Sequence, residues 1–184
     1  MRMARVAMIG ATGFLLLLAG RAQAQAVHQM QAVPDGLVQE VRDATRQFLD
    51  VNATADGHYF PVLGCVSGGP QPGAMGVHYL NGDLLMDHGA IDPDHPEALL
   101  YEFKNGKATL TAVEFIVLAA DWDPSHPHQP PALRGQLFSY TGSPNRFGLD
   151  PFYSLHVWAW KDNPDGTFVD WNPKVSCDGF VSNP

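Results

Sequence analysis

The stretch ALLYEFKNGKATLTAVEFIVLAA, residues 98–120, decides the fold. Two runs rich in aliphatic, aromatic and β-branched residues, at 98–103 and 108–120, flank the dipeptide Asn105-Gly106. Such runs favour strands, and Asn-Gly favours a two-residue turn between antiparallel strands. The stretch therefore predicts a β-hairpin, around which the rest of the sheet is expected to form.

Shorter runs on either side of the hairpin predict further strands. Gly and Pro interrupt the chain every few residues from position 58 onward, and the segments between them are short and apolar. This pattern is typical of a sheet. We expect strands at 76–80, 155–160 and 167–171, with the turn KDNPDG joining the last two into a second hairpin.

One long helix is expected before the strands, within VPDGLVQEVRDATRQFLDVNA at 33–53. Leu37, Val41, Ala44 and Phe48 recur at helical spacing and the residues between them are mostly polar. This is the pattern of an amphipathic helix with one face on a core. The chain is thus predicted to be α+β: an N-terminal amphipathic helix packed on a bent antiparallel sheet or small β-barrel.

The first residues are typical of a secretory signal peptide. Arg2 and Arg5 precede an apolar run that is too short to span a bilayer, and small residues follow at the spacing that a signal peptidase cleaves. We expect residues 1–24 to be removed, with cleavage after Ala26 as the alternative. Residues 25–184 are then a single exported globular domain, in the periplasm or outside the cell.

The exported domain is acidic. The whole chain has 11 Lys and Arg residues against 19 Asp and Glu residues, and removing Arg2, Arg5 and Arg21 leaves 8 against 19, a formal charge of −11. Such a surface repels phosphate backbones and anionic lipids. The charge argues against binding to nucleic acid and to membrane surfaces, and the short apolar run argues against membrane insertion of the mature form. Small molecules and metal ions remain as ligand classes.

The two cysteines, Cys65 and Cys177, are expected to form a disulfide, because an exported chain with one pair of cysteines folds in an oxidising compartment. The alternative is a reactive thiol or a thiolate metal ligand, but neither residue has a C-x-x-C neighbour. The bridge would tie the start of the sheet region to the end of the chain.

A histidine shares a strand with tryptophans near the C-terminus. Alternate residues of a strand share a face, so Ser154, His156, Trp158 and Trp160 should point to one side of the predicted strand. A buried ring nitrogen without a partner costs on the order of 1–3 kcal/mol, so a histidine in such apolar surroundings needs a hydrogen bond or a metal. His78, in GVHYLN, has the same character.

Two carboxylates of the first hairpin complete a candidate metal site. Glu114 lies in the most apolar run of the chain, and Glu102 is expected as its neighbour across the hairpin. We hypothesise that His78, His156 and Glu114 hold one Zn, Fe, Mn or Cu ion, with Glu102 as a fourth ligand or general base. The alternative is a polar core in which these groups only satisfy one another. The sequence does not distinguish an enzyme from a binding protein.

A second hypothesis is a metal-free binding module. Tyr79, Tyr101, Trp158 and Trp160 are candidates for an aromatic cleft that takes a small neutral or cationic ligand. A third is an envelope structural protein, in which the aromatic and histidine side chains only complete the core. No hydrolase elbow, zinc-binding H-E-x-x-H helix or phosphate-binding loop occurs in the chain.

Four segments carry a resemblance to other proteins. They are GAMGVHYLN (73–81), PEALLYE (96–102), the strand motif VEF (113–115) and LHVWAWKDNPDGTFVDWNPKVSC (155–177), and together they resemble a family of small exported bacterial proteins of unknown function. The resemblance spans most of the mature chain and implies export and a shared single domain. It brings no activity with it. It draws attention to the two histidines and the glutamate of the metal hypothesis, which lie within the family-like blocks.

Overall fold

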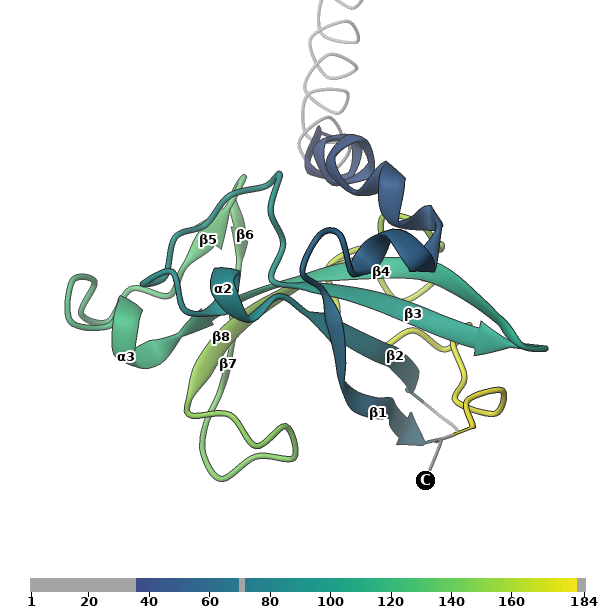
Figure 1. Ribbon diagram of the computed structural model, residues 1–184. Coiled ribbons are helices and arrows are strands. Elements are labelled where there is room, and N and C mark those ends of the chain that lie inside the picture. The colour runs from purple at the N-terminus through teal and green to yellow at the C-terminus, as the bar shows by residue number, and fades with distance from the viewer. Residues whose placement is uncertain (1–35, 70–71, 182–184) are drawn as a thin grey trace, which may run out of the picture. The chain divides into compact units, whose positions relative to one another are not determined.

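The computed structural model describes residues 36–69 and 72–181, and the predicted signal peptide with its cleavage site lies outside them. A six-stranded antiparallel sheet with the order β1-β2-β3-β4-β8-β7 forms its centre. The sheet is curled like half of a barrel, which confirms the predicted bent antiparallel sheet (Figure 1). Within the described residues, no helix is long and apolar enough to cross a membrane.

The elements have the following bounds: β1 Phe60–Gly69, β2 Gly73–Leu80, α2 Gly82–Leu85, β3 Ala98–Lys104, β4 Lys107–Leu118, α3 Ala119–Trp122, β5 Ala132–Leu133, β6 Gln136–Leu137, β7 Ser139–Thr141 and β8 Phe152–Val157. Strands β5 and β6 form a separate two-stranded sheet.

The predicted hairpin is confirmed as β3 and β4. Lys104 pairs with Lys107, so the connection is the two-residue turn Asn105-Gly106. Asn105 has φ 52° and Gly106 has φ 74°. Positive φ at both central positions is what a type I′ turn requires, and its twist matches that of the strands it joins.

The predicted C-terminal hairpin is wrong. Strand β8 ends at Val157, residues 158–160 leave the sheet, and residues 167–171 form no strand. The backbone N–H groups of Trp160 and Lys161 both donate to the carbonyl of Thr111, at 3.1 and 3.0 Å, instead of extending the ladder. Thr111 itself lies at the irregularity in the β3–β4 register. The bulge therefore ends β8 early.

The bend separates the two tryptophans that were expected to share a face. Trp158 is buried among the residues of one core cluster, whereas Trp160 packs against the other. The indole N–H of Trp160 donates to the hydroxyl of Thr45, at 3.0 Å. The alternation of side chains between the two faces holds for Ser154, His156 and the first residue after the strand, Trp158, and fails at Trp160.

The two faces of the sheet bury separate apolar clusters. Val113 and Phe115 belong to the first cluster, and Ala112 and Ile116 belong to the second. A strand that is buried on both faces has a nearly continuous run of apolar residues in its sequence. This explains the composition of β4. Glu114 alternates with Val113 and Phe115, so its side chain lies on the second face.

The helical segment 36–45 covers the first face. Leu37 and Val41 are buried in the first cluster, and the 3-10 helices Arg46–Leu49 and Val51–Thr54 follow directly and contact β4. Figure 1 shows the segment above β3 and β4. The beginning of the predicted helix lies outside the described residues.

Strand β1 was not predicted, because Gly and Pro interrupt its apolar pattern. It pairs with β2 through several register shifts and forms one edge of the sheet. Cys65 of β1 is bonded to Cys177, with 5.6 Å between the Cα atoms. The predicted disulfide is confirmed, and an oxidised pair indicates a compartment other than the cytoplasm.

The C-terminal segment returns across the second face. Asn172 forms a β-bridge with Ala74 of β2, and Val175 is buried in the second cluster. The disulfide follows shortly after, at Cys177. This return path brings the residues just before Asn172 close to β8.

Gly76 allows β2 to approach β3 closely. It has φ +101°, and a Cβ at this position would lie 2.6 Å from the carbonyl oxygen of Tyr101. Both features exclude any other residue without a shift of the backbone. The close approach sets the position of His78, two residues further along β2.

Candidate metal centre

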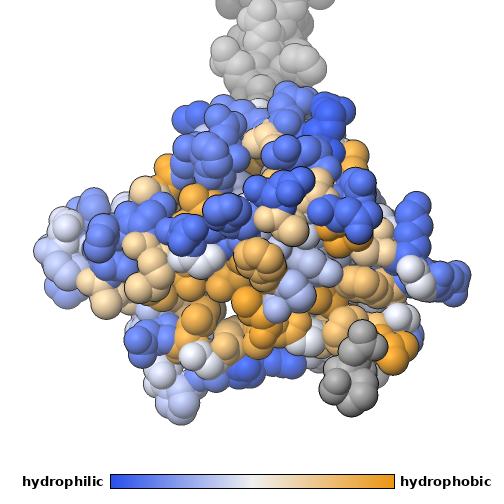
Figure 2. Space-filling model, in the orientation of Figure 1, coloured by the Kyte–Doolittle hydropathy of each residue, from blue (hydrophilic) through white to orange (hydrophobic). Residues whose placement is uncertain are grey.

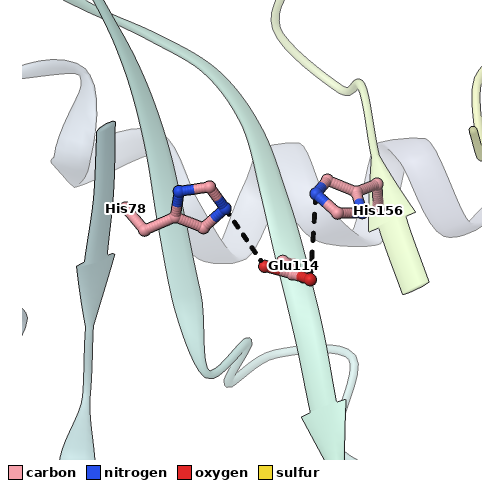
Figure 3. Close-up of side chains that lie close together, drawn as sticks. All are labelled: His78, Glu114 and His156. Carbon is pink, nitrogen blue, oxygen red and sulfur yellow. Dashed lines mark ion pairs between the residues drawn. The ribbon is translucent and has the colours of Figure 1, made fainter. Parts of the chain in front are cut away.

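Three side chains from three strands meet on the second face of the sheet. Glu114 of β4 pairs directly with His156 of β8, and His78 comes from β2, on the other side of β3. His78 pairs with Leu100, which pairs with Ala112, so His78 is diagonal to Glu114 on the same face. Figure 3 shows both rings turned toward the carboxylate from opposite sides.

The donor atoms are close enough for one ion. One nitrogen of each histidine and one carboxylate oxygen lie within 4.8 Å of one another. Nε2 of His78 is 3.3 Å from Oε2 of Glu114, and Nε2 of His156 is 3.8 Å from Oε1. Two ligands bound at about 2.1 Å in tetrahedral geometry are about 3.4 Å apart. The two observed spacings, which involve different oxygens of the carboxylate, lie on either side of that value.

The group is buried, and its ring nitrogens are incompletely satisfied. The exposed fractions of the His78, Glu114 and His156 side chains are 6, 8 and 1%. Among the described residues, Nδ1 of His78 and both ring nitrogens of His156 are buried without a hydrogen-bond partner. Because most buried polar atoms in native proteins are satisfied, three orphaned nitrogens in one cluster require an explanation.

The electrostatics favour a cation at this position. Burial alone would raise the pKa of Glu114, but His156 and His78 outweigh it and lower this pKa to about 2. Burial likewise opposes the charged form of His156, but Glu114 and then Asp170 outweigh it and raise the pKa of the imidazole. The carboxylate thus remains ionised in an apolar core because positive charge lies beside it.

Asp170 is a neighbour that the sequence analysis did not identify. Its Oδ1 lies 3.4 Å from Nδ1 of His156, at ion-pair distance although out of line for a hydrogen bond. Nε2 of the same ring faces Glu114. In a metal-binding histidine, one ring nitrogen usually faces the metal and the other contacts a carboxylate or another acceptor. The only signal in the sequence was that Asp170 lies within the C-terminal family-like block.

Glu102 does not join the group. It pairs with Thr109 across the hairpin, whereas the partner of Glu114 on β3 is Ala98. The Glu102 carboxylate instead accepts hydrogen bonds from Nζ of Lys161, at 2.5 Å, and from the backbone N–H of Ser176, at 3.1 Å. It therefore fixes the C-terminal segment, and the geometry gives no support for a role as ligand or base.

The four aromatic candidates do not converge on one cleft. Tyr79 and Tyr101 contact each other and belong to the first cluster, as does Trp160, while Trp158 belongs to the second. The hydroxyl of the fully buried Tyr101 donates to the carbonyl of Phe48, at 2.5 Å. Such contacts are those of packing residues.

Comparisons with known proteins add no further constraint. No protein-family model matches the chain, and no curated protein or solved structure does either. The assignment of the site therefore depends on its geometry. Within the described residues, His78, Glu114 and His156 are the one group of three or more metal-ligating side chains with donor atoms this close together.

Proposed function

We propose that the protein binds a single divalent transition metal, Zn, Fe, Mn or Cu, through His78, Glu114 and His156. The observation that carries the proposal is the convergence of three donor atoms within 4.8 Å in a buried position. Two imidazoles and one carboxylate are a ligand set of both catalytic zinc sites and non-haem iron sites.

A metal accounts for these side chains better than a polar core does. In a polar core without a metal, each buried ring nitrogen would have a hydrogen-bond partner. A buried polar group without a partner costs more free energy than a formed hydrogen bond contributes. Nε2 of His156, which faces Glu114 at 3.8 Å, lacks one here. An ion placed between the rings and Glu114 would coordinate the ring nitrogens that face the carboxylate. The positive charge of the ion would then keep Glu114 ionised, in place of the charge on the imidazole.

The number of ligands indicates what the metal can do. Structural zinc sites are closed by four protein ligands, whereas catalytic sites keep a position open for water or substrate. Three ligands from this chain leave at least one position open. The metal would then be able to act as a Lewis acid or to activate a bound water molecule, in the periplasm or outside the cell, where the disulfide is stable.

Elemental analysis of the mature protein tests the proposal. The protein is purified from the periplasm without an affinity tag or chelator, beside the His78→Ala/His156→Ala double variant and Glu114→Gln. His95→Ala serves as the matched control, because His95 is exposed and pairs with Asp92, at 2.9 Å. We expect near-stoichiometric metal in the parent and the control, and none in the two site variants.

Two features keep the result interpretable. Glu114→Gln conserves the shape of the side chain, so a loss of metal from a variant with an unchanged circular dichroism spectrum reports on the site and not on the fold. A metal-free parent that takes up no Zn, Fe, Mn or Cu ion during dialysis would overturn the proposal. The three residues would then be a polar element of a metal-free protein.

A further inference from the structure

An apolar cavity opens onto the candidate metal centre. It has a volume of about 250 Å³, and its wall is apolar except for His78 and Glu114. The polar side chains that line it are thus two of the three metal ligands. An apolar pocket with a few convergent polar groups is the usual form of a small-molecule site.

The sheet supplies one wall of this cavity. Leu80, Ala98 and Ile116 come from three neighbouring strands, and Leu63 and Val62 of β1 complete that side. Val62 is 51% exposed, so the cavity reaches the surface beside β1. In the view of Figure 2, apolar residues gather across the middle of the molecule, between hydrophilic residues above and below.

The connection between β7 and β8 supplies the opposite wall with Phe147 and Leu149. Asn145 holds this loop in shape: its side-chain amide donates to the carbonyls of Gly142 and Leu149, both at 2.9 Å, and its oxygen accepts from the backbone N–H of Phe147, at 3.1 Å. The loop is therefore organised by its own hydrogen bonds, and the cavity does not depend on a ligand for its walls.

A second, smaller cavity approaches the centre from the side of His156. It has a volume of about 150 Å³ and its lining includes Thr141, Arg146 and Asp170. Glu114 lines both cavities. The centre thus faces an apolar space on the His78 side and a space of mixed polar and apolar lining on the His156 side.

From this arrangement we infer that the protein binds a small molecule with an apolar body and a single metal-coordinating head group. This inference rests on the proposed metal site. The apolar body occupies the cavity between β1 and the β7–β8 loop, and the head group takes the open position on the metal. A cavity of 150 Å³ accommodates benzene, so one of about 250 Å³ accommodates roughly ten non-hydrogen atoms.

The position and lining of the cavity favour a ligand site. The cavity is open to the surface beside Val62 and reaches His78 and Glu114, which are buried. Its wall is otherwise apolar, and apolar side chains that face an empty space lack van der Waals contacts on that side. An apolar ligand in the cavity would supply those contacts.

A homologous series of straight-chain hydroxamates, from acetohydroxamate to octanohydroxamate, tests the inference. Each member carries the same chelating head and a longer alkyl chain. Their binding to the Co(II)-loaded protein is followed by the visible spectrum of the metal. Because each buried methylene contributes about 0.8 kcal/mol, affinity should rise about fourfold per added methylene until the cavity is full.

Two variants locate the binding. Val62→Trp places a bulky ring at the surface end of the cavity and should abolish the dependence on chain length while acetohydroxamate still binds. Leu137→Trp makes the same change on β6, at a residue that is 65% exposed and does not line the cavity, and should leave the series unchanged.

The possible failures are distinguishable. A protein that binds Co(II) but shows equal affinity along the series would overturn this inference and leave the metal site standing. A chain-length dependence that survives Val62→Trp would also overturn it, because the alkyl chain would then lie elsewhere. A protein that takes up neither Co(II) nor any of Zn, Fe, Mn and Cu would overturn the proposed function, and this inference with it.

Discussion

Glu114 and His156 are direct cross-strand partners on β4 and β8, with Oε1 of the carboxylate 3.8 Å from Nε2 of the ring. Pairing fixes the spacing of the two side chains through the backbone, so the relationship does not depend on a flexible loop. His78, one strand beyond β3, adds the third donor atom. The centre is therefore preorganised by the sheet.

Replacing the carboxylate should abolish metal binding. We expect Glu114→Gln to lower the affinity for Zn²⁺ by at least about 100-fold. Even residues that contact a metal ligand without binding the metal typically contribute about 10- to 100-fold to metal affinity. Glu102→Gln is the matched control: its side chain contacts Lys161 and Ser176, so the affinity should stay within about twofold. Competition with a chromophoric chelator measures both. Equal losses in the two variants would contradict the assignment.

Asp170 should act through His156. Its side chain is 42% exposed, so Asp170→Asn is expected to leave the fold intact and to weaken Zn²⁺ binding about 10- to 100-fold, as the loss of an orienting carboxylate does. Asp162→Asn is the control, because Asp162 is exposed and its side chain pairs with Lys174, away from His156. An Asp170→Asn affinity equal to that of the control would show that His156 needs no such partner.

Glu97 predicts a pH-dependent stability that is present without a bound metal. Burial raises its pKa to about 8, even though its carboxylate accepts a 2.8 Å hydrogen bond from the backbone N–H of Ile116. The folded state then holds a proton that the unfolded state, with a pKa of 4.5, has released. Stability from this group is complete below pH 4.5 and is lost as the pH rises toward 8.

The Glu97→Gln variant isolates that contribution, because its amide oxygen can still accept from Ile116. Relative to the parent, the variant should gain stability between pH 5 and pH 8, by at most about 1.4 kcal/mol per pH unit. Urea unfolding in the presence of a chelator measures the difference without interference from bound metal. A difference that does not change with pH would mean that Glu97 titrates normally.

Gly76 should be intolerant of any side chain. Gly76→Ala combines a positive φ with a contact of 2.6 Å to the Tyr101 carbonyl, and we expect it to destabilise the protein by about 3 kcal/mol or more and to weaken metal binding through His78. Gly106→Ala has a positive φ but open space around it, so it should cost only about 1 kcal/mol and leave metal binding unchanged. Similar losses of stability in the two variants would contradict the proposed close approach.

Some features of the fold follow directly from the sequence. Asn105-Gly106 predicts the hairpin because few other dipeptides adopt positive φ at both positions. His78, Glu114 and His156 were candidates because ionisable groups are rare in strands that are apolar on both faces. Local residue pattern was sufficient in each case.

Other features depended on irregularities and on contacts between distant parts of the chain. The two-residue turn sets the register so that Glu102 pairs with Thr109. Ala98, which pairs with Glu114, lies about 13 Å away from Glu102 along the strand, so Glu102 is not the cross-strand neighbour of Glu114. The early end of β8 results from the bulge at Thr111, which no periodicity reveals. Asp170 reaches His156 because Asn172 pairs with Ala74, nearly 100 residues earlier in the chain.

A crystal structure of the metal-loaded protein, with diffraction data collected on both sides of the absorption edge of the bound metal, tests the central claim most directly. We predict one anomalous peak within about 2.0–2.3 Å of a nitrogen of His78, a nitrogen of His156 and an oxygen of Glu114. A peak at surface histidines alone, or no peak among these three residues in protein that contains stoichiometric metal, would contradict the account.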